Sequence, residues 1–537
     1  MSSIIRPKVV VYLWLGAIVV LGVAGCHSPE HYKSDADEEV YSIIDSKWQE
    51  GYGEKANYKI GDVEPSPNDI QLEEIIPESN VLSLVDAVAI ATANNREYKT
   101  EKEQLYLIAL ALTIKRHNFA RQWLGTFDGQ YARGAEDEEI SYDADTGFSQ
   151  LLADGAIVSM NIGLDWARFL TGSPGTSLTS VLSSTITQPL LRGAGRRIVQ
   201  EELTQAERGA LYRIRSFNRF RKGFVVSIVS AYYRVLQQKD AVTNAESNHR
   251  RVLESKERLE MEAEAGRRSR IDVDEAGQNA LRAENTLVKA KESYERGLDG
   301  FKIDLALPTD ADIELDQNEL KALEKLGIGQ PDYTLESAVE TASLRRLDLA
   351  NSRDKVDDAV RKIAVAEDNL RAELNLVGST SVGSKGKTDF GTLQFQDGSY
   401  ELGIESDLPF DRKSERNAYR RSLITLMQQQ RQYEEDVDKM KLAVRRAYRQ
   451  LQETSDRYNI QKNSLQLAEQ RVESNKLLLD AGRVSVRVLL ESQDDLLEAQ
   501  DNVTKALVDH LVAKLSLYQD VGILQVRPDG MWEQSVQ

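Results

Sequence analysis

The feature that most constrains this chain is an internal duplication. A strand-like segment ending at Pro189 is followed by a long helical pattern that breaks at Gly266. A second strand pattern, ending at Pro409, is followed by a helical run that breaks at Gly482. Both breaks read Ala-Gly-Arg, and aligning the two glycines also aligns the apolar positions of the long helices. The sequence therefore predicts two copies of one unit, each a strand region followed by a long helix.

Composition excludes several classes of protein. The chain has 537 residues, a net charge of −18 and only 7% aromatic residues, which favours long helices over a thick core. A strongly acidic chain is a poor partner for nucleic acid. The histidines are dispersed without metal-ligand spacing, and neither Gly-x-Ser-x-Gly nor His-Glu-x-x-His occurs. We therefore expect no enzyme, no metal and no cofactor.

The amino terminus reads as a secretory signal. Arg6 and Lys8 precede the apolar run Val9–Val23, and Ala24-Gly25 lead into Cys26, the only cysteine. The run is short for a transmembrane anchor. The segment Val23-Ala24-Gly25-Cys26 resembles a bacterial lipobox. This resemblance predicts a signal peptide over residues 1–25, a lipid on Cys26 and a location in the cell envelope. The polar, proline-containing residues 26–80 are expected to form an extended arm from the lipid to the first repeat, with one short helix around 40–48.

Long helices dominate each repeat. Helical patterns of about forty residues begin near Leu84 and Leu335 and precede the strand regions. Patterns of about seventy residues follow each strand region and predict helices about 100 Å long. Leu489 and Leu496 recur seven residues apart in a narrow apolar stripe, which is typical of coiled coils. The glycine breaks then mark hairpin tips where the chain returns antiparallel.

The strand regions alternate polar and apolar residues. An ordinary sheet would give the same pattern, but strands near ten residues long, aromatic ends and a secreted address favour a membrane barrel. A long helix precedes each strand region and another follows it, and both must lie on the same side of the membrane. Each copy must therefore cross the membrane an even number of times. The first copy shows three strand-like segments, near 123–132, 156–167 and 178–188. We expect two crossings per copy, with the remaining strand-like segment in an extracellular loop that includes Glu136–Glu139.

Four strands per chain cannot close a barrel, and open sheet edges are not tolerated in lipid. Self-association is therefore expected, and three chains would give a twelve-stranded barrel.

The ordered set of motifs resembles the TolC family of outer-membrane efflux proteins over residues 80–530. The set comprises Gln188–Gly193 at the strand exit, the two Ala-Gly-Arg tips and the ending Asp520–Leu524. The resemblance implies a mainly α fold with β structure and a homotrimeric assembly. In this homotrimer, a twelve-stranded outer-membrane barrel continues into a periplasmic α-helical barrel. It also implies a periplasmic adaptor and an inner-membrane pump of the RND, ABC or MFS kind as partners.

Site residues follow from these patterns. Carboxylates narrow the tunnel after the second tip in this family, which makes Glu491 a gate candidate, with Asp272 and Glu275 at the first tip. Val488 departs from the acidic pattern. Asp128 and Asp165 are candidates for a cation-favouring lumen of the barrel, and Pro189, Gly193 and Pro409 mark strand-to-helix exits. The candidate adaptor-docking residues are Gly266, Arg267, Arg268, Ser269, Gly482, Arg483, Val484 and Ser485.

Each candidate has a simpler interpretation. Arginines near a helix end also balance the helix dipole, and Glu491 is also an ordinary solvated helix residue. The lumen carboxylates are equally compatible with water near a strand end.

Along the chain, the sequence predicts six segments. They are a signal peptide (1–25), an arm (26–80), repeat 1 (81–300), an inter-repeat equatorial segment (301–332), repeat 2 (333–520) and a carboxyl-terminal equatorial segment (521–537). Within the repeats we expect β-hairpins near 123–189 and 372–408, and tips at 265–270 and 481–486.

The expected function is that of an exit duct of an efflux or type I secretion system in the bacterial outer membrane. The alternative is a periplasmic coiled-coil lipoprotein without a pore.

Overall fold

The computed structural model describes most of the chain, and its contacts divide the chain into two compact units. One unit comprises residues 1–48, 105–211 and 364–419, and the other comprises 49–104, 212–363 and 420–537. The predicted signal peptide and Cys26 lie outside the described residues. The described residues are 27–49, 52, 55, 58–60, 80–133, 138–169, 176–329, 333–384, 393–527 and 532–534.

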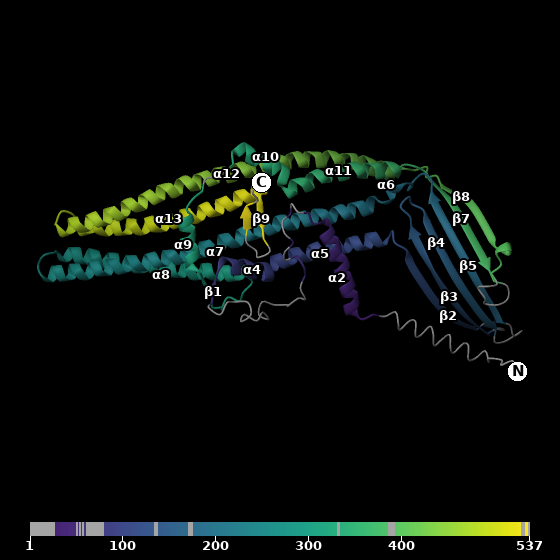
Figure 1. Cartoon of the computed structure of the whole chain (residues 1–537), viewed down its shortest axis with the longest axis horizontal. Coiled ribbons are helices and arrows are strands. Elements are labelled where there is room, and N and C mark those ends of the chain that lie inside the picture. Colours follow the sequence, from purple (N-terminus) through teal and green to yellow (C-terminus); the bar gives the residue numbers. More distant parts are fainter. Residues whose placement is uncertain are drawn as a thin grey trace. The chain divides into compact units, whose positions relative to one another are not determined.

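A six-stranded antiparallel sheet belongs to the first unit (Figure 1). Its strand order is β2-β3-β4-β5-β7-β8, so the strands of this sheet pair in the order in which they occur in the chain, and β2 and β8 are the two edges. The six strands are β2 (Gln122–Arg133), β3 (Glu138–Leu151), β4 (Ile157–Phe169), β5 (Thr176–Pro189), β7 (Glu373–Gly383) and β8 (Ser399–Asp407).

The register gives the sheet one apolar and one polar face. Phe148 lies opposite Trp123 on β2 and Met160 on β4, so aromatic and aliphatic side chains share one face. The alternate residues, such as Ser149 and Ser159, share the other face. Successive side chains of a strand point to opposite faces, so this alternation separates the apolar from the polar side chains across the sheet.

The expected four strands per chain are wrong, because the sheet has six. All three segments recognised in the first copy are strands, and a fourth, β3, begins at Glu138 in the stretch assigned to a loop. Its Asp143, Asp145 and Gly147 are typical turn residues, but in the sheet they lie on the polar face, with Asp143 and Asp145 exposed and Gly147 buried. Each copy nevertheless supplies an even number of strands to the sheet, four from the first copy and two from the second.

The extended arm is also a wrong prediction for residues 29–39, because helix α2 (Pro29–Lys47) begins well before the short helix expected around 40–48. Ser28 caps this helix by accepting a hydrogen bond from the His31 amide, and Pro29 suits its first turn. The apolar stripe Val40, Ile43 and Ile44 is buried. Burying such side chains contributes roughly 1.5–3 kcal/mol each, which outweighs the freedom of a polar tether.

Polar contacts fix α2 within the first unit. The Tyr106 hydroxyl donates to Asp37 at 2.7 Å, and the Lys47 ammonium lies 2.5 Å from a Glu207 carboxylate oxygen. Both partners belong to the helices α5 (Arg96–His117) and α7 (Glu201–Glu264).

Two long helical hairpins account for much of the second unit (Figure 1). Helix α7 is followed by α8 (Arg270–Asp304), and α12 (Lys413–Asp480) is followed by α13 (Val486–Val521). Polar pairs join the two arms of each hairpin, for example Lys291 with Glu246 at 3.0 Å and Arg457 with Asp509 at 2.5 Å.

The helices that precede the strands are broken rather than continuous. In the first copy α4 (Leu84–Asn94) ends one residue before α5, and in the second copy α10 (Leu335–Arg345) ends one residue before α11 (Leu347–Asp368). The residues at the breaks, Asn95 and Arg346, have non-helical backbone angles. The equivalent position of the two breaks supports the duplication.

Short elements complete the second unit. β1 (Val81–Leu82) pairs in parallel with β6 (Glu314–Leu315), and β9 (Leu524–Val526) pairs with β10 (Trp532–Gln534). Helix α9 (Gln317–Leu326) lies in the inter-repeat segment.

A search of the described residues for helices suited to crossing a membrane, by length and apolar character, found none.

Candidate functional site: hairpin tips and the polar sheet face

The two hairpin tips share one backbone motif. Gly266 and Gly482 adopt positive φ angles of +72° and +69°, which residues with a Cβ rarely adopt. The next amide, at Arg267 and at Arg483, donates to the carbonyl five residues earlier, at 2.8 and 2.9 Å. This left-handed motif ends the first helix of each hairpin and turns the chain back.

The returning helices begin differently at the two tips. The Ser269 hydroxyl accepts a hydrogen bond from the Asp272 amide at 3.1 Å, and the Asp272 carboxylate accepts one from the Ser269 amide at 3.3 Å. At the second tip Ser485 occupies the cap position without a side-chain hydrogen bond, and Val488 stands where the carboxylate would be. Asp272 thus has a capping role, and Val488 marks the absence of a capping box as well as of an acidic gate residue.

Ionic and polar contacts join one hairpin to the other near the tips. The Arg258 guanidinium on α7 pairs with the Asp480 carboxylate at the end of α12 and also donates to Glu262 at 3.0 Å. Arg268 donates to the same Glu262 carboxylate at 3.0 Å and to the Leu479 carbonyl at 2.9 Å. These hydrogen bonds hold the pKa of Glu262 below its usual value, and the one from Arg258 has the larger effect.

A further ion pair connects the returning helices. Arg487 on α13 pairs with Glu275 on α8, and this hydrogen bond raises the pKa of Arg487. Glu275 is therefore a charged partner between hairpins in this conformation. Glu491, one turn beyond Arg487, is exposed.

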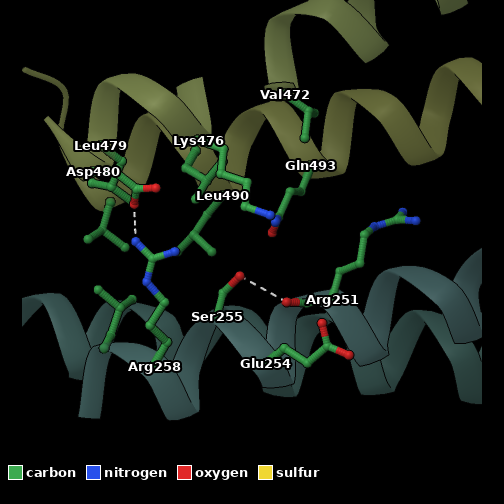
Figure 2. Close-up of a pocket in the computed structure, with 13 residues that line it drawn as sticks. Arg251, Glu254, Ser255, Arg258, Val472, Lys476, Leu479, Asp480, Leu490 and Gln493 are labelled. Atoms are coloured by element: carbon green, nitrogen blue, oxygen red, sulfur yellow. Dashed lines mark hydrogen bonds and ion pairs between the residues drawn. The ribbon is translucent and has the colours of Figure 1, made fainter. Parts of the chain in front are cut away.

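A cavity of about 250 Å³ lies between the hairpins close to these contacts (Figure 2). Helix α7 contributes Arg251 and Glu254, and α12 contributes Lys476. Figure 2 shows Arg258 reaching across to Asp480 on the other hairpin. Apolar packing adjoins the cavity, through a cluster made of Leu259, Ala276, Leu479, Val486, Leu489 and Leu490.

The eight docking candidates divide into two groups. Arg268 is half-buried against the other hairpin, and Val484 packs against the apolar cluster. Six are exposed: Gly266, Arg267, Ser269, Gly482, Arg483 and Ser485.

The strand-to-helix exits differ between the copies. Pro189 ends β5, and Gly193 follows with a φ of +77°, its amide donating to the buried Asp368 carboxylate at 2.7 Å. In the second copy Pro409 lies between β8 and α12, and the side chain of the following Phe410 is fully exposed.

The register brings the two predicted barrel carboxylates onto one row of the polar face. Asp128 on β2 lies opposite Asp143 on β3, which lies opposite Asp165 on β4. The Asp145 carboxylate reaches over Gly163, where an added Cβ would come within 2.7 Å of its oxygen. Asp143 was missed because its strand was assigned to a loop, although the alternation of Asp143 and Asp145 with Tyr142 and Ala144 was the available signal.

The rest of this face is acidic as well. Glu401 lies opposite Ser379, and Glu405 lies opposite Asn375. Among the strand residues described on this face there is no lysine or arginine. Like charges opposite one another destabilise a sheet, so this row of aspartates does not serve stability.

Comparison with solved structures identifies the fold. The chain is similar to the Campylobacter jejuni CmeC outer-membrane channel, with 15% identity, a TM-score of 0.58 and coverage of 91% of this chain and 93% of that one. The open-state Neisseria gonorrhoeae MtrE outer-membrane channel has 16% identity and a TM-score of 0.59, with coverage of 87% and 96%. The Vibrio cholerae outer-membrane protein VceC has 13% identity and a TM-score of 0.58, with coverage of 82% and 96%.

The chain therefore has the fold of the TolC-type outer-membrane channels, which confirms the fold expected from the resemblance. No protein family model and no curated protein sequence matches the chain.

Proposed function

We propose that this protein is the outer-membrane exit duct of a tripartite efflux or type I secretion system. The observation that carries the proposal is the fold shared with CmeC and MtrE, both outer-membrane channels, along nearly the whole of each chain. The duct itself is passive, and the energy for transport comes from its partners.

The sheet supplies the membrane-spanning wall in this proposal. One face carries Trp123, Phe127 and Tyr131 toward lipid, and the other carries the carboxylates of Asp128, Asp143 and Asp165 toward a water-filled lumen. A lumen without fixed positive charge on its strands favours cations over anions.

The hairpin tips supply the gate and the docking surface. The contacts of Arg258 with Asp480 and of Arg487 with Glu275 hold the hairpins of one chain together and resist opening. Glu491 remains the exposed gate candidate. The exposed tip residues, including Arg267 and Arg483, meet a periplasmic adaptor, while the inward-facing Arg268 and Val484 support the tip from within.

The assembly is a homotrimer anchored in the bacterial outer membrane. A lipid on Cys26, which lies outside the described residues, adds to the anchorage. The partners are a periplasmic membrane-fusion adaptor and an inner-membrane pump of the RND, ABC or MFS kind. The fold is common to ducts for small molecules and for proteins, so the cargo is defined by those partners.

Conductance in a planar lipid bilayer tests the proposal. The purified, lipid-modified full-length protein should insert as an oligomer and give discrete cation-selective current steps. The competing function, a periplasmic coiled-coil lipoprotein without a pore, gives no current steps and no oligomer that survives in detergent. Either of these negative results would reject the duct.

A further inference from the structure

We propose that this channel closes its membrane wall with six strands from each chain, so that the trimer has an eighteen-stranded barrel instead of a twelve-stranded one. The inference rests on the proposed function for the number of chains. It concerns the sheet alone, and the partner that completes each sheet edge is a second copy of this chain.

The first observation is that the β3–β4 hairpin is part of the wall. It lies between β2 and β5, and its register runs from Arg133 opposite Glu138 to Gln122 opposite Ser149 on one side. On the other side β4 pairs with β5 from Ile157 to Arg168. A loop insertion would leave β2 paired with β5, whereas here the hairpin separates them along their whole length.

The turn of this hairpin, residues 152–156, is hydrogen-bonded to the segment that follows β5. The Leu152 amide donates to the Ala156 carbonyl at 2.7 Å, and the Gly195 amide donates to the Asp154 carbonyl at 2.9 Å. Gly155 has a φ of +100°, and an added Cβ would lie 2.6 Å from the Gly193 carbonyl oxygen. Both strands of the hairpin therefore reach the end of the sheet where the helices begin.

The hairpin has the two faces that a membrane wall needs. Tyr142 and Phe148 on β3 share the apolar face with Met160 on β4, while Asp143 and Asp165 share the polar face. This is the alternation seen in outer-membrane strands, with apolar side chains toward lipid and polar ones toward the lumen.

The two sheet edges fit each other. With six strands in antiparallel order, β2 and β8 run in opposite directions, so β8 of one copy can pair antiparallel with β2 of the next. Neither edge strand contains lysine or proline, the residues that commonly prevent edge pairing. The edges also expose large apolar side chains, with Trp123 71%, Leu402 79% and Ile404 71% exposed. Such head-to-tail contacts generate rings.

Strand number sets the width of the lumen. With strands about 4.8 Å apart and tilted by about 40°, eighteen strands give a backbone-to-backbone diameter of about 36 Å, against about 24 Å for twelve. Barrels of this larger size hold an open aqueous channel. The outer exit would thus pass bulky hydrated solutes, and the tips remain the narrow point.

A three-dimensional reconstruction of the full-length oligomer in detergent or nanodiscs tests the strand count directly. Eighteen strands are expected, with β2 of each chain beside β8 of its neighbour. A twelve-stranded wall, formed either by two chains or by three chains with β3–β4 folded outside it, would overturn the inference.

Thiol cross-linking tests the edge pairing. A protein with Thr126→Cys on β2 and Gly403→Cys on β8 should give covalent dimers and trimers with a short bifunctional reagent. Each single variant should remain largely monomeric in denaturing gels, as should Ser183→Cys combined with Gly403→Cys, since Ser183 lies inside the sheet. Oligomers that do not depend on the β2–β8 combination would contradict the pairing.

Deletion of residues 138–169 tests the width. It removes two strands and preserves the antiparallel order, because β2 can then pair with β5. Polyethylene glycols added on the extracellular side should enter the intact channel at a larger size than the deleted one, while β2–β8 cross-links persist. An unchanged size limit would overturn the inference, and if the deleted chain does not assemble, the strand count of the intact protein decides.

The outcomes separate this inference from the proposed function. A conducting channel with a twelve-stranded wall overturns only the inference. An eighteen-stranded oligomer that never conducts overturns only the proposed function.

Discussion

Lys222 on α7 shows what a single residue contributes to this molecule. It is only 8% exposed, and burial, together with the charges of Arg221, Arg345 and Arg219, lowers its pKa to about 8. An unfolded chain holds the lysine proton up to about pH 10.4. Below pH 8 the folded state therefore bears the full cost of a buried charge.

The pH dependence of stability has a definite sign. Between about pH 8 and pH 10 the folded chain has released the Lys222 proton while the unfolded chain still holds it, so this residue makes stability rise with pH. Lys222→Met should raise the melting temperature at pH 7 and remove this rise. Thermal unfolding followed by circular dichroism from pH 7 to pH 10 measures both effects.

Lys239 on the same helix provides the control of opposite sign. Burial opposes its charge, but the hydrogen bond to Glu314 at 3.2 Å, together with the contacts to Tyr294 and the charge of Glu314, outweighs burial and raises its pKa. Lys239→Met should therefore lower the melting temperature at pH 7. Equal effects of the two substitutions would show that loss of charge, and not its environment, is what matters.

The Arg258–Asp480 pair is a second prediction at this scale. Arg258→Ala removes the contact between hairpins and frees Glu262 from one of its two arginines. Channel openings in planar bilayers should become several-fold more frequent, because the hairpins separate more easily. Arg296→Ala is the matched control, since Arg296 pairs with Glu292 on its own helix. Identical opening rates for the two variants would exclude Arg258 from the gate.

At the scale of elements, the long helices owe their ends to single residues. Gly266 and Gly482 hold left-handed backbone at the tips, whereas Gly277 lies within α8 with nothing within 4 Å of an added Cβ. The same substitution should therefore act oppositely at a tip and within a helix.

Gly482→Ala places a Cβ on left-handed backbone and should destabilise the tip by about 1 kcal/mol. Gly277→Ala should stabilise its helix by up to about 1 kcal/mol, because alanine is the better helix former. Hydrogen exchange of the tip and α8 amides measures both. Slower exchange at the tip of the Gly482 variant would refute the backbone argument.

At the scale of the whole molecule, the acidic sheet face becomes a property of the pore. Replacing Asp128, Asp143 and Asp165 by asparagine removes three carboxylates per chain while keeping their shape. Reversal potentials in a potassium chloride gradient should shift toward those of a non-selective pore. Glu292→Gln, an exposed site on α8, should leave the selectivity unchanged. A triple variant with full cation selectivity would place the filter elsewhere.

The sequence alone determined the features that depend on neighbouring residues. The duplication, the tips at Gly266 and Gly482 and the two-faced strands follow from local backbone preferences and from residue periodicity, which are properties of short segments. The general fold was also predictable, through the ordered motifs that resemble a known family.

Tertiary structure decided what depends on distant partners. The row of Asp128, Asp143 and Asp165 exists only because the register of three strands aligns them, and the pairing of Arg258 with Asp480 joins residues more than 200 positions apart. Strand number was misjudged for the same reason. A polar, aspartate-rich segment is a loop or a strand according to whether neighbouring strands supply its hydrogen bonds and water covers its polar face, and no short stretch of sequence records that.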